Sequence, residues 1–233
     1  MVKKYLLLLA MLSVHAGCTG KTGQELYSDG VKALREGKSG SAIVLFRSVL
    51  EKEQNRSDAR YQLAKAYFAE GRYTLADKEF QKVYRQNPAQ PGIHLDLAQL
   101  YNALKKPDLA LSHAEQYRAD HTDSADALEA IGSAYLIKMM PDQAETYFLK
   151  ALQQVPGKQS AKLELAALYL QQAKPLQAQA LLEDIIKGNP LHLRANNLLA
   201  DTQIAMGHKA EARSTSHWLI ASLTAGSLGC GGG

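Results

Sequence analysis

Two short segments carry residue types that bind phosphate groups. Gly37-Lys38-Ser39 and Gly20-Lys21-Thr22 each match the end of a phosphate-binding loop, in which backbone N–H groups, a lysine and a hydroxyl hold the phosphates. The same loop needs a further glycine five residues earlier, and this chain has Lys32 and His15 at those places. Because the spacing fails in both segments, the sequence predicts no nucleotide site.

The histidines and carboxylates show no pattern of metal ligands or of catalytic pairs. Such sites need groups that converge on one point, and the sequence has neither the HExxH nor the GxSxG motif. Acidic residues such as Asp96 and Asp126 are expected on a solvated surface. The histidines beyond residue 20 occupy unrelated places: His94, His113, His121, His192, His208 and His217. We therefore expect a protein that is not an enzyme and that has no metal, no cofactor and no small-molecule substrate.

The charge balance argues against nucleic acid as a partner. The chain has 27 Lys and Arg against 23 Asp and Glu, a formal net charge of +4. Loss of Lys3 and Lys4 with an N-terminal presegment would leave 25 basic residues against 23 acidic ones, a net charge of +2. A nucleic-acid-binding surface gathers Lys and Arg on one face, whereas here they are interspersed with carboxylates.

Cys18 is the residue with the clearest chemical prediction. It follows residues 1–17, which have the pattern of a targeting segment: two lysines, then the apolar run Tyr5 to Val14, too short to span a bilayer of about 30 Å as a helix. Ala16-Gly17-Cys18 resembles the end of a bacterial lipobox, although His15 departs from the usual aliphatic residue. The resemblance implies a lipid anchor on Cys18. An ordinary cleaved secretion signal, with the cysteine incidental, stays open.

The residue after Cys18 bears on the compartment. Similar lipoproteins with Asp at that place tend to stay in the inner membrane, whereas this chain has Thr19. The resemblance therefore implies a periplasm-facing lipoprotein of the bacterial cell envelope, held at the outer membrane, with residues 18–22 as a short tether.

The rest of the chain repeats with a step of 34 residues, as from Ala42 to Ala76. Small residues recur in two series, which allow helices to approach closely. The first series is Gly30, Ala64, Ala98, Gly132, Ala166 and Ala200, and the second is Ala42, Ala76, Ala110, Ala144, Ala178 and Ala212. Between them the middle repeats carry a large wedge, at Tyr67, Tyr101, Tyr135 and Tyr169. Glycines and prolines such as Gly71 and Pro88 punctuate the apolar stripes, which predicts pairs of helices.

These residues resemble the tetratricopeptide repeat (TPR) family, whose unit is a helix-turn-helix with small, Tyr, Ala, aromatic and Pro positions. Phe46, Phe80 and Phe148 fill the aromatic position, while Ala114, Leu182 and Ser216 depart from it. The resemblance implies an all-α fold, a right-handed superhelical α-solenoid of about six TPR hairpins over residues 23–222. The expected repeats are 23–56, 57–90, 91–124, 125–158, 159–192 and 193–222. Lys158 is expected on the surface, where its replacement would change stability little.

In the TPR family the first helix of each hairpin lines a concave groove with its second, fifth, ninth and twelfth residues. The resemblance therefore implies a partner-binding groove, with exposed aromatic residues at its N-terminal end, that suits an extended or helical peptide. Its predicted residues are Tyr27, Tyr61, Lys65, Phe68, Leu95, Gln99, Asn102, Glu129, Ser133, Leu136, Leu170, Asn197 and Asp201. The alternative is that some of these side chains are buried against the next repeat.

Three functions remain open from the sequence. The second repeat, which reads YQLAKAYFAEGRYTLADKEFQKVY, resembles lipoproteins of PEP-CTERM/exosortase exopolysaccharide systems and implies a scaffold for export or assembly. Size, repeat number and lipid anchor also resemble those of lipoproteins that help a type IV pilus secretin to assemble. The third is a periplasmic adaptor subunit of an envelope enzyme. All three bind protein partners.

The repeat pattern weakens near the C-terminus. Ser216 replaces the aromatic residue, and a glycine-rich tail, residues 223–233, is expected to be disordered. Its Cys230 has no partner for a disulfide if Cys18 is acylated. A solenoid normally ends in a capping helix with a polar outer face. We expect the residues beyond about Ser214 to be either a poorly packed remnant of the second helix or the product of a truncated or frame-shifted reading of a longer repeat array. The alternative is a short variant in which Leu219 and Ile220 cover the last seam.

Overall fold

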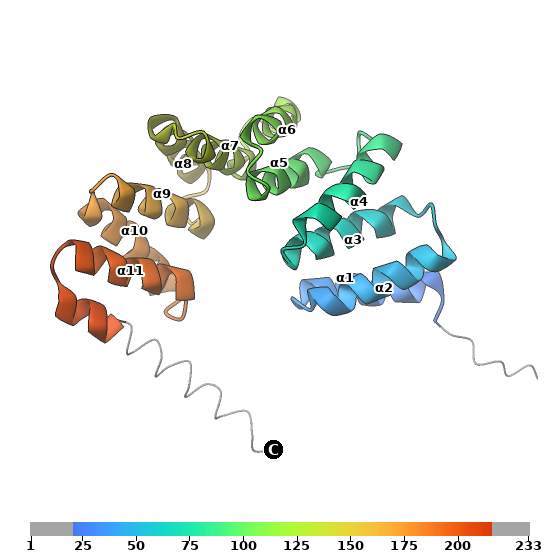
Figure 1. Cartoon of the computed structure of the whole chain (residues 1–233), viewed down its shortest axis with the longest axis horizontal. Helices are drawn as coiled ribbons and strands as arrows, with labels where there is room; N and C mark the ends of the chain where they lie inside the picture. The colour runs from blue at the N-terminus through green and yellow to red at the C-terminus, as the bar shows by residue number, and fades with distance from the viewer. Residues whose placement is uncertain (1–20, 216–233) are drawn as a thin grey trace, which may run out of the picture. The chain divides into compact units, whose positions relative to one another are not determined.

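The computed structural model describes residues 21–215, and the chain divides into two compact units, Met1–Pro88 and Ala89–Gly233. All regular elements in the described part are α-helices (Figure 1), which confirms the predicted all-α helical repeat fold. The predictions for the targeting segment, Cys18, Cys230 and the C-terminal tail lie outside the described residues. The right-handed sense of the superhelix stays a prediction.

The first unit contains two helical hairpins. The first hairpin pairs α1 (Gly23–Arg35) with α2 (Ser39–Lys52), and the second pairs α3 (Ser57–Ala69) with α4 (Tyr73–Gln86). Each helix packs against the next in the sequence, and α1 also contacts α3 (Figure 1). The first helices of successive hairpins therefore lie side by side in this unit.

The second unit continues the same pattern. Its helices are α5 (Ile93–Ala103), α6 (Pro107–Asp120), α7 (Ala125–Ile137), α8 (Pro141–Gln154), α9 (Gln159–Gln171), α10 (Pro175–Gly188) and α11 (Leu193–Ala205). Residues 209–215, where the description ends, are helical as well. Consecutive helices pack together, and the first helices meet in the pairs α5–α7 and α9–α11.

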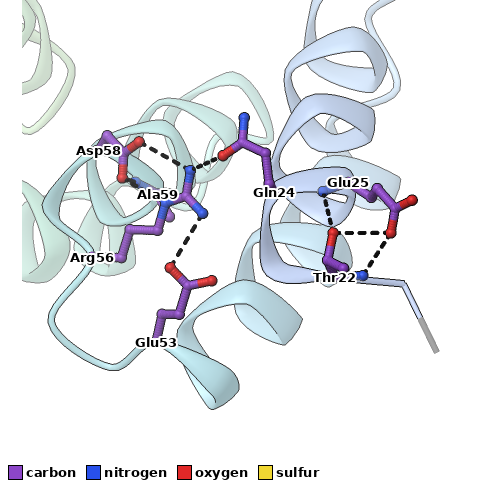
Figure 2. Close-up of polar contacts among 7 residues, drawn as sticks. All are labelled: Thr22, Gln24, Glu25, Glu53, Arg56, Asp58 and Ala59. Atoms are coloured by element: carbon purple, nitrogen blue, oxygen red, sulfur yellow. Dashed lines mark hydrogen bonds and ion pairs between the residues drawn. The ribbon is translucent and has the colours of Figure 1, made fainter. Parts of the chain in front are cut away.

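The helix starts follow from local sequence. Thr22 caps α1 through a capping box: its hydroxyl accepts the Glu25 N–H, and the Glu25 carboxylate accepts the Thr22 N–H at 2.7 Å (Figure 2). Prolines begin three second helices, at Pro107, Pro141 and Pro175. Proline suits that first position because its missing N–H would have no partner there and its φ angle is already helical.

Every first helix ends in the same turn. In α1 the N–H of Gly37 donates to Leu34 O and the N–H of Lys38 donates to Ala33 O, which is the Schellman arrangement. The residue equivalent to Gly37 has a positive φ in all hairpins: Gly37, Gly71, Lys105, Met139, Ala173 and Gly207. Three of these are not glycine, so the left-handed backbone there carries a steric cost.

The two series of small residues lie in the core. The second series, from Ala42 to Ala212, is buried throughout, as is the first series from Gly30 to Ala200. A Cβ atom on Gly132 would lie 2.7 Å from Phe148 Cε1, and one on Gly30 would lie 2.7 Å from Phe46 Cε1. In these two hairpins the aromatic ring of the second helix therefore rests directly on the backbone of the first helix, and the glycine leaves room for the ring.

The tyrosine wedge also packs as expected. Tyr67, Tyr101 and Tyr169 are buried, and a cationic side chain from the following turn lies over each ring. The distances to the ring centroids are 5.1 Å for Arg72, 5.8 Å for Lys106 and 5.5 Å for Lys174. The cation–π contact ties the turn to the hairpin core while the charge stays in water.

Candidate interaction surface

The predicted groove residues all lie on first helices, at the fifth, ninth and twelfth places of the repeats. We call these side chains the first-helix row. Contacts α1–α3, α5–α7 and α9–α11 bring neighbouring members of the row together within each unit. The side chains of the row differ widely in exposure. Some pack within their own hairpin, some bridge to the next hairpin, and others face solvent.

The two tyrosines of the first-helix row in the first unit differ in how deeply they are buried. Tyr61 is 8% exposed, and its ring meets Phe80 edge-on with centroids 5.9 Å apart. Tyr27 meets Phe46 in the same way and at the same distance, but stays half-buried. Tyr61 is therefore a residue of the hairpin core, which is the alternative that the sequence left open. It does not provide the exposed aromatic ring that was predicted there.

The next turn of α3 leaves more surface accessible. Phe68 is half-buried, with its ring tilted against Tyr73 at a centroid distance of 5.5 Å. Lys65 is also half-buried, and its ammonium lies 5.5 Å from the centroid of Tyr61. An apolar ring beside a cation suits a partner side chain with apolar and acidic groups.

Arg56 is a residue of this surface that sequence reasoning missed. It bridges α1 and α3: its guanidinium donates to Gln24 Oε1 at 2.7 Å and pairs with Asp58 at 3.0 Å and Glu53 at 3.3 Å (Figure 2). The same group lies 4.5 Å from the centroid of Tyr27. The available signal was a basic residue at the last place of a repeat with acidic residues on both sides.

In the second unit, Asn102 links two first helices. Its amide nitrogen donates to Ala130 O of α7 at 2.7 Å, while its Oδ1 is buried without a hydrogen-bond partner. Leu95 on the same helix is half-buried, and Gln99 is exposed. Of these three predicted groove residues, Gln99 therefore presents the most accessible polar group.

Glu129 links α7 to α9 through two contacts. Its carboxylate accepts a hydrogen bond from the Ser160 hydroxyl at 2.8 Å and pairs with Lys158 at 3.0 Å. Lys158 also pairs with Asp126 at 2.5 Å, and only 16% of its side chain is exposed. Burial of the ammonium lowers the pKa of Lys158, but hydrogen bonds and the charges of both carboxylates outweigh it and hold that pKa above its ordinary value. Lys158 is therefore not the freely exposed residue that the sequence predicted, because its ammonium bridges two carboxylates.

The remaining residues of the first-helix row differ in exposure from one repeat to another. Ser133 is half-buried, and Leu136 and Leu170 are half-buried against the core around Phe148 and Leu182. The two members on α11, Asn197 and Asp201, are exposed. The polar, solvent-facing end of the row in the second unit thus lies on α11.

Clustered metal ligands and long apolar helices are both absent from the described residues. Between Lys21 and Thr215, no three His, Cys, Asp or Glu side chains gather closely enough to hold a metal ion. Within the same range, no helix has both the length and the apolar character needed to cross a bilayer. The groups that do converge are hydrogen-bonding and apolar side chains, which suit binding of another chain.

Comparisons with known proteins agree with this architecture. Models of the tetratricopeptide repeat family match residues 33–79, 67–133 and 163–215. A search of curated protein sequences gives no match.

Several solved structures share the fold. A thermophilic TPR protein of Thermus thermophilus, TTC0263, is 21% identical; the likeness covers 78% of this chain and 100% of that one, with a TM-score of 0.69. PilF of Pseudomonas aeruginosa is 22% identical, with 84% and 90% covered and a TM-score of 0.64. PilW, a widely conserved type IV pilus biogenesis factor, is 17% identical, with 88% and 95% covered and a TM-score of 0.71. At these identities the likeness shows the fold alone.

Proposed function

Because the chain belongs to the tetratricopeptide repeat family, we propose that it is a non-catalytic scaffold that binds protein partners through its first-helix row. The observation that carries this proposal is that some side chains of the first-helix row join neighbouring helices while others face solvent. Asn102 and Glu129 hold successive first helices together, while Gln99 on α5 and Asn197 and Asp201 on α11 are exposed. A fixed backbone with free amides and carboxylates can bind an extended or helical segment at low entropic cost.

The proposed scaffold is held at the bacterial cell envelope by a lipid on Cys18. This part rests on the sequence, where an apolar run ends in Ala16-Gly17-Cys18. Stable anchoring needs more than one acyl chain at about 0.8 kcal/mol per buried CH₂, which a diacylated cysteine would supply. Cys18→Ser is expected to move the full chain from the membrane to the soluble fraction; a variant that stays membrane-bound would contradict the anchor.

We place the scaffold in exopolysaccharide-linked export of PEP-CTERM proteins, on the resemblance of residues 61–84 to lipoproteins of those systems. A second candidate is type IV pilus assembly, which is favoured by the likeness in fold and length to PilW. The neighbouring genes separate the two: polysaccharide synthesis and exosortase genes support the first, and pilus genes support the second.

Site-specific photo-crosslinking tests the binding surface. A benzophenone amino acid replaces Gln99 or Asn197 in the full chain, expressed in its native host, and crosslinked proteins are identified by mass spectrometry. Both positions are exposed on first helices, so both are expected to capture the same partner.

Matched controls carry the same probe on second helices, at Gln116 of α6 and Gln153 of α8, which are also exposed. These positions are expected to give no specific product. Capture of the partner with equal yield from both sets of positions would refute the first-helix row as the binding surface.

A further inference from the structure

Two histidines meet between α5 and α6. His94 on α5 and His113 on α6 lie with their Nδ1 atoms 2.9 Å apart, which is hydrogen-bond distance. The His113 ring also stacks on Tyr101, with centroids 5.6 Å apart and an interplanar angle of 24°. Both rings are partly buried between the two helices. The pair therefore belongs to the packing of this hairpin.

The contact restricts how many protons the pair can hold. For a hydrogen bond, one Nδ1 must carry a hydrogen and the other must have a free lone pair. The hydrogen bond persists after one proton is added, because the Nδ1–H of a charged ring can donate to the Nδ1 lone pair of a neutral ring. A second added proton leaves two N–H groups and two positive charges facing each other. The doubly protonated pair is incompatible with the observed geometry.

The pKa values of both rings are lowered. Burial lowers the pKa of His94, and the charge of Asp120 on α6 opposes this only in part. Burial also lowers the pKa of His113, and a charge on His94 lowers it further.

Several charged groups of α6 and α7 form ion pairs. Asp126 and Glu129 of α7 pair with Lys158, and Lys138, which directly follows α7, pairs with Asp108 of α6. On α6, Arg118 pairs with Glu115. Tyr101 of α5 stacks on His113, and Asp96 lies on α5 two residues beyond His94.

Another hairpin has an ion pair at the same two places. In the second repeat, Arg60 on α3 and Glu79 on α4 stand 34 residues before His94 and His113, and their side chains meet at 2.7 Å. Burial acts to raise the pKa of Glu79, but hydrogen bonds and charges from Lys82 and Arg60 outweigh it and leave that pKa lowered. This ion pair keeps its charges at the acidity that would charge both histidines.

We propose that His94 and His113 form an acid-sensitive clasp between α5 and α6, closed while the pair holds at most one added proton and opened when both rings are charged. The sign follows from linkage. The histidine pKa values are lowered in the closed hairpin, so full stability is present above the open-state value of about 6.5. It is lost as the pH falls from that value through the lower pKa values of the closed state. This proposal does not depend on the partner-binding function.

Hydrogen exchange of the full chain at pH 7, 6 and 5, corrected for intrinsic exchange rates, tests the clasp. The opening constant of the α5–α6 hairpin is expected to rise toward acid pH by up to about tenfold per pH unit for each proton that only the open form binds. The α9–α10 hairpin, residues 159–188, contains no histidine and serves as the internal control. An equal change in both hairpins would overturn the proposal.

Two variants identify the residues responsible. The double variant His94→Arg, His113→Glu copies the Arg60–Glu79 pair and is expected to abolish the acid response between pH 7 and 5 while keeping the helices. The single variant His94→Gln leaves one titrating ring and is expected to weaken the response. Retention of the full response in either folded variant would refute the clasp.

Ring ¹⁵N NMR gives a separate readout in the unmodified chain. The pair is expected to titrate with apparent pKa values below about 6.5, the second step lying well below the first, because the two sites share one favourable proton. Independent titration of both rings at or above about 6.5 would also refute the clasp.

Discussion

The contact between Gly132 and Phe148 makes a quantitative prediction. A methyl group added by Gly132→Ala would lie 2.7, 2.9 and 3.1 Å from three ring atoms of Phe148, whereas ordinary contacts lie at 3.4–4 Å. The ring must therefore recede by about 0.7 Å, the difference between 2.7 and 3.4 Å, and it is completely buried. Overpacking of this kind costs about 1–3 kcal/mol.

Helix propensity acts in the opposite direction. Replacing a helical glycine by alanine gains about 0.8–1.0 kcal/mol, so Gly132→Ala is expected to lower the free energy of unfolding by up to about 2 kcal/mol. Gly40→Ala is the matched control: Gly40 also lies within a helix, and its added methyl would meet only Glu70 Oε1 at 3.8 Å. That variant is expected to be neutral or stabilised by up to about 1 kcal/mol.

The assay is urea unfolding followed by circular dichroism at 222 nm, with a double-mutant cycle. Phe148→Leu alone removes ring contacts and destabilises the protein. Combined with Gly132→Ala it makes room for the methyl group, so the double variant is expected to be more stable than the sum of the single changes by about 1–3 kcal/mol. Repeat five has this combination naturally, with Ala166 and Leu182 at the equivalent places.

Either of two results would refute this reasoning. The first is that Gly132→Ala stabilises the protein as much as Gly40→Ala does. The second is that the double-mutant cycle shows no coupling between positions 132 and 148. In the second repeat, Ala64 and Phe80 occupy the equivalent places and both are buried. A hairpin can therefore accommodate the methyl group beside the ring, which places the expected cost of Gly132→Ala toward the lower end of the range.

Three further changes have clear expected outcomes in the same assay. Met139 has φ 59° and is 85% exposed, so Met139→Gly is expected to stabilise the protein by about 0.5–1 kcal/mol. Gly71 has φ 70°, so Gly71→Ala is expected to destabilise it by about 1 kcal/mol. The opposite order of stability would contradict the left-handed turn. Lys158→Ala is expected to lower the free energy of unfolding by about 1 kcal/mol, whereas replacement of the exposed Lys209 by alanine is expected to change it very little. Equal effects of the two substitutions would contradict a stabilising contact between Lys158 and Glu129. Because the pKa of Lys158 is raised, its contribution is present below the unfolded-state value of about 10.4 and is lost as the pH rises through the folded-state value. Ala144→Leu is expected to destabilise by about 1–3 kcal/mol, since its side chain is fully buried; a thermal shift no larger than that of Lys209→Ala would contradict the hairpin register.

The sequence predicted those features of the fold that depend on residue size at fixed spacing. The buried alanines from Ala42 to Ala212 could be found because close helix packing excludes larger side chains at every repeat. The left-handed turn was visible only where it is glycine, as at Gly71. At Lys105 and Met139 the same backbone is imposed by the hairpin rather than by the residue, so local sequence gives no signal.

The candidate surface was less predictable, because its contacts join residues that are far apart in the chain. Lys158 meets Asp126 across a separation of 32 residues, and Asn102 meets Ala130 across 28. A repeat pattern gives the place of each side chain within its own hairpin. It does not say whether that side chain reaches the next hairpin or faces solvent, because this depends on length and charge in two repeats at once. Tyr61 illustrates the same limit, since the ring of Phe80 decides its burial.

One pair of places shows how the repeats keep their geometry while their chemistry changes. The fourth and twenty-third places hold the ion pair Arg60–Glu79 in one hairpin and the hydrogen-bonded pair His94–His113 in the next. In the fourth repeat, Tyr147 packs against the apolar cluster that contains Leu128 at the equivalent places. The backbone tolerates all three because the buried small residues, not these pairs, set the distance between the helices. Response to acid can therefore differ from hairpin to hairpin on one unchanged scaffold, which is why a change confined to α5 and α6 can be separated experimentally from the stability of the fold.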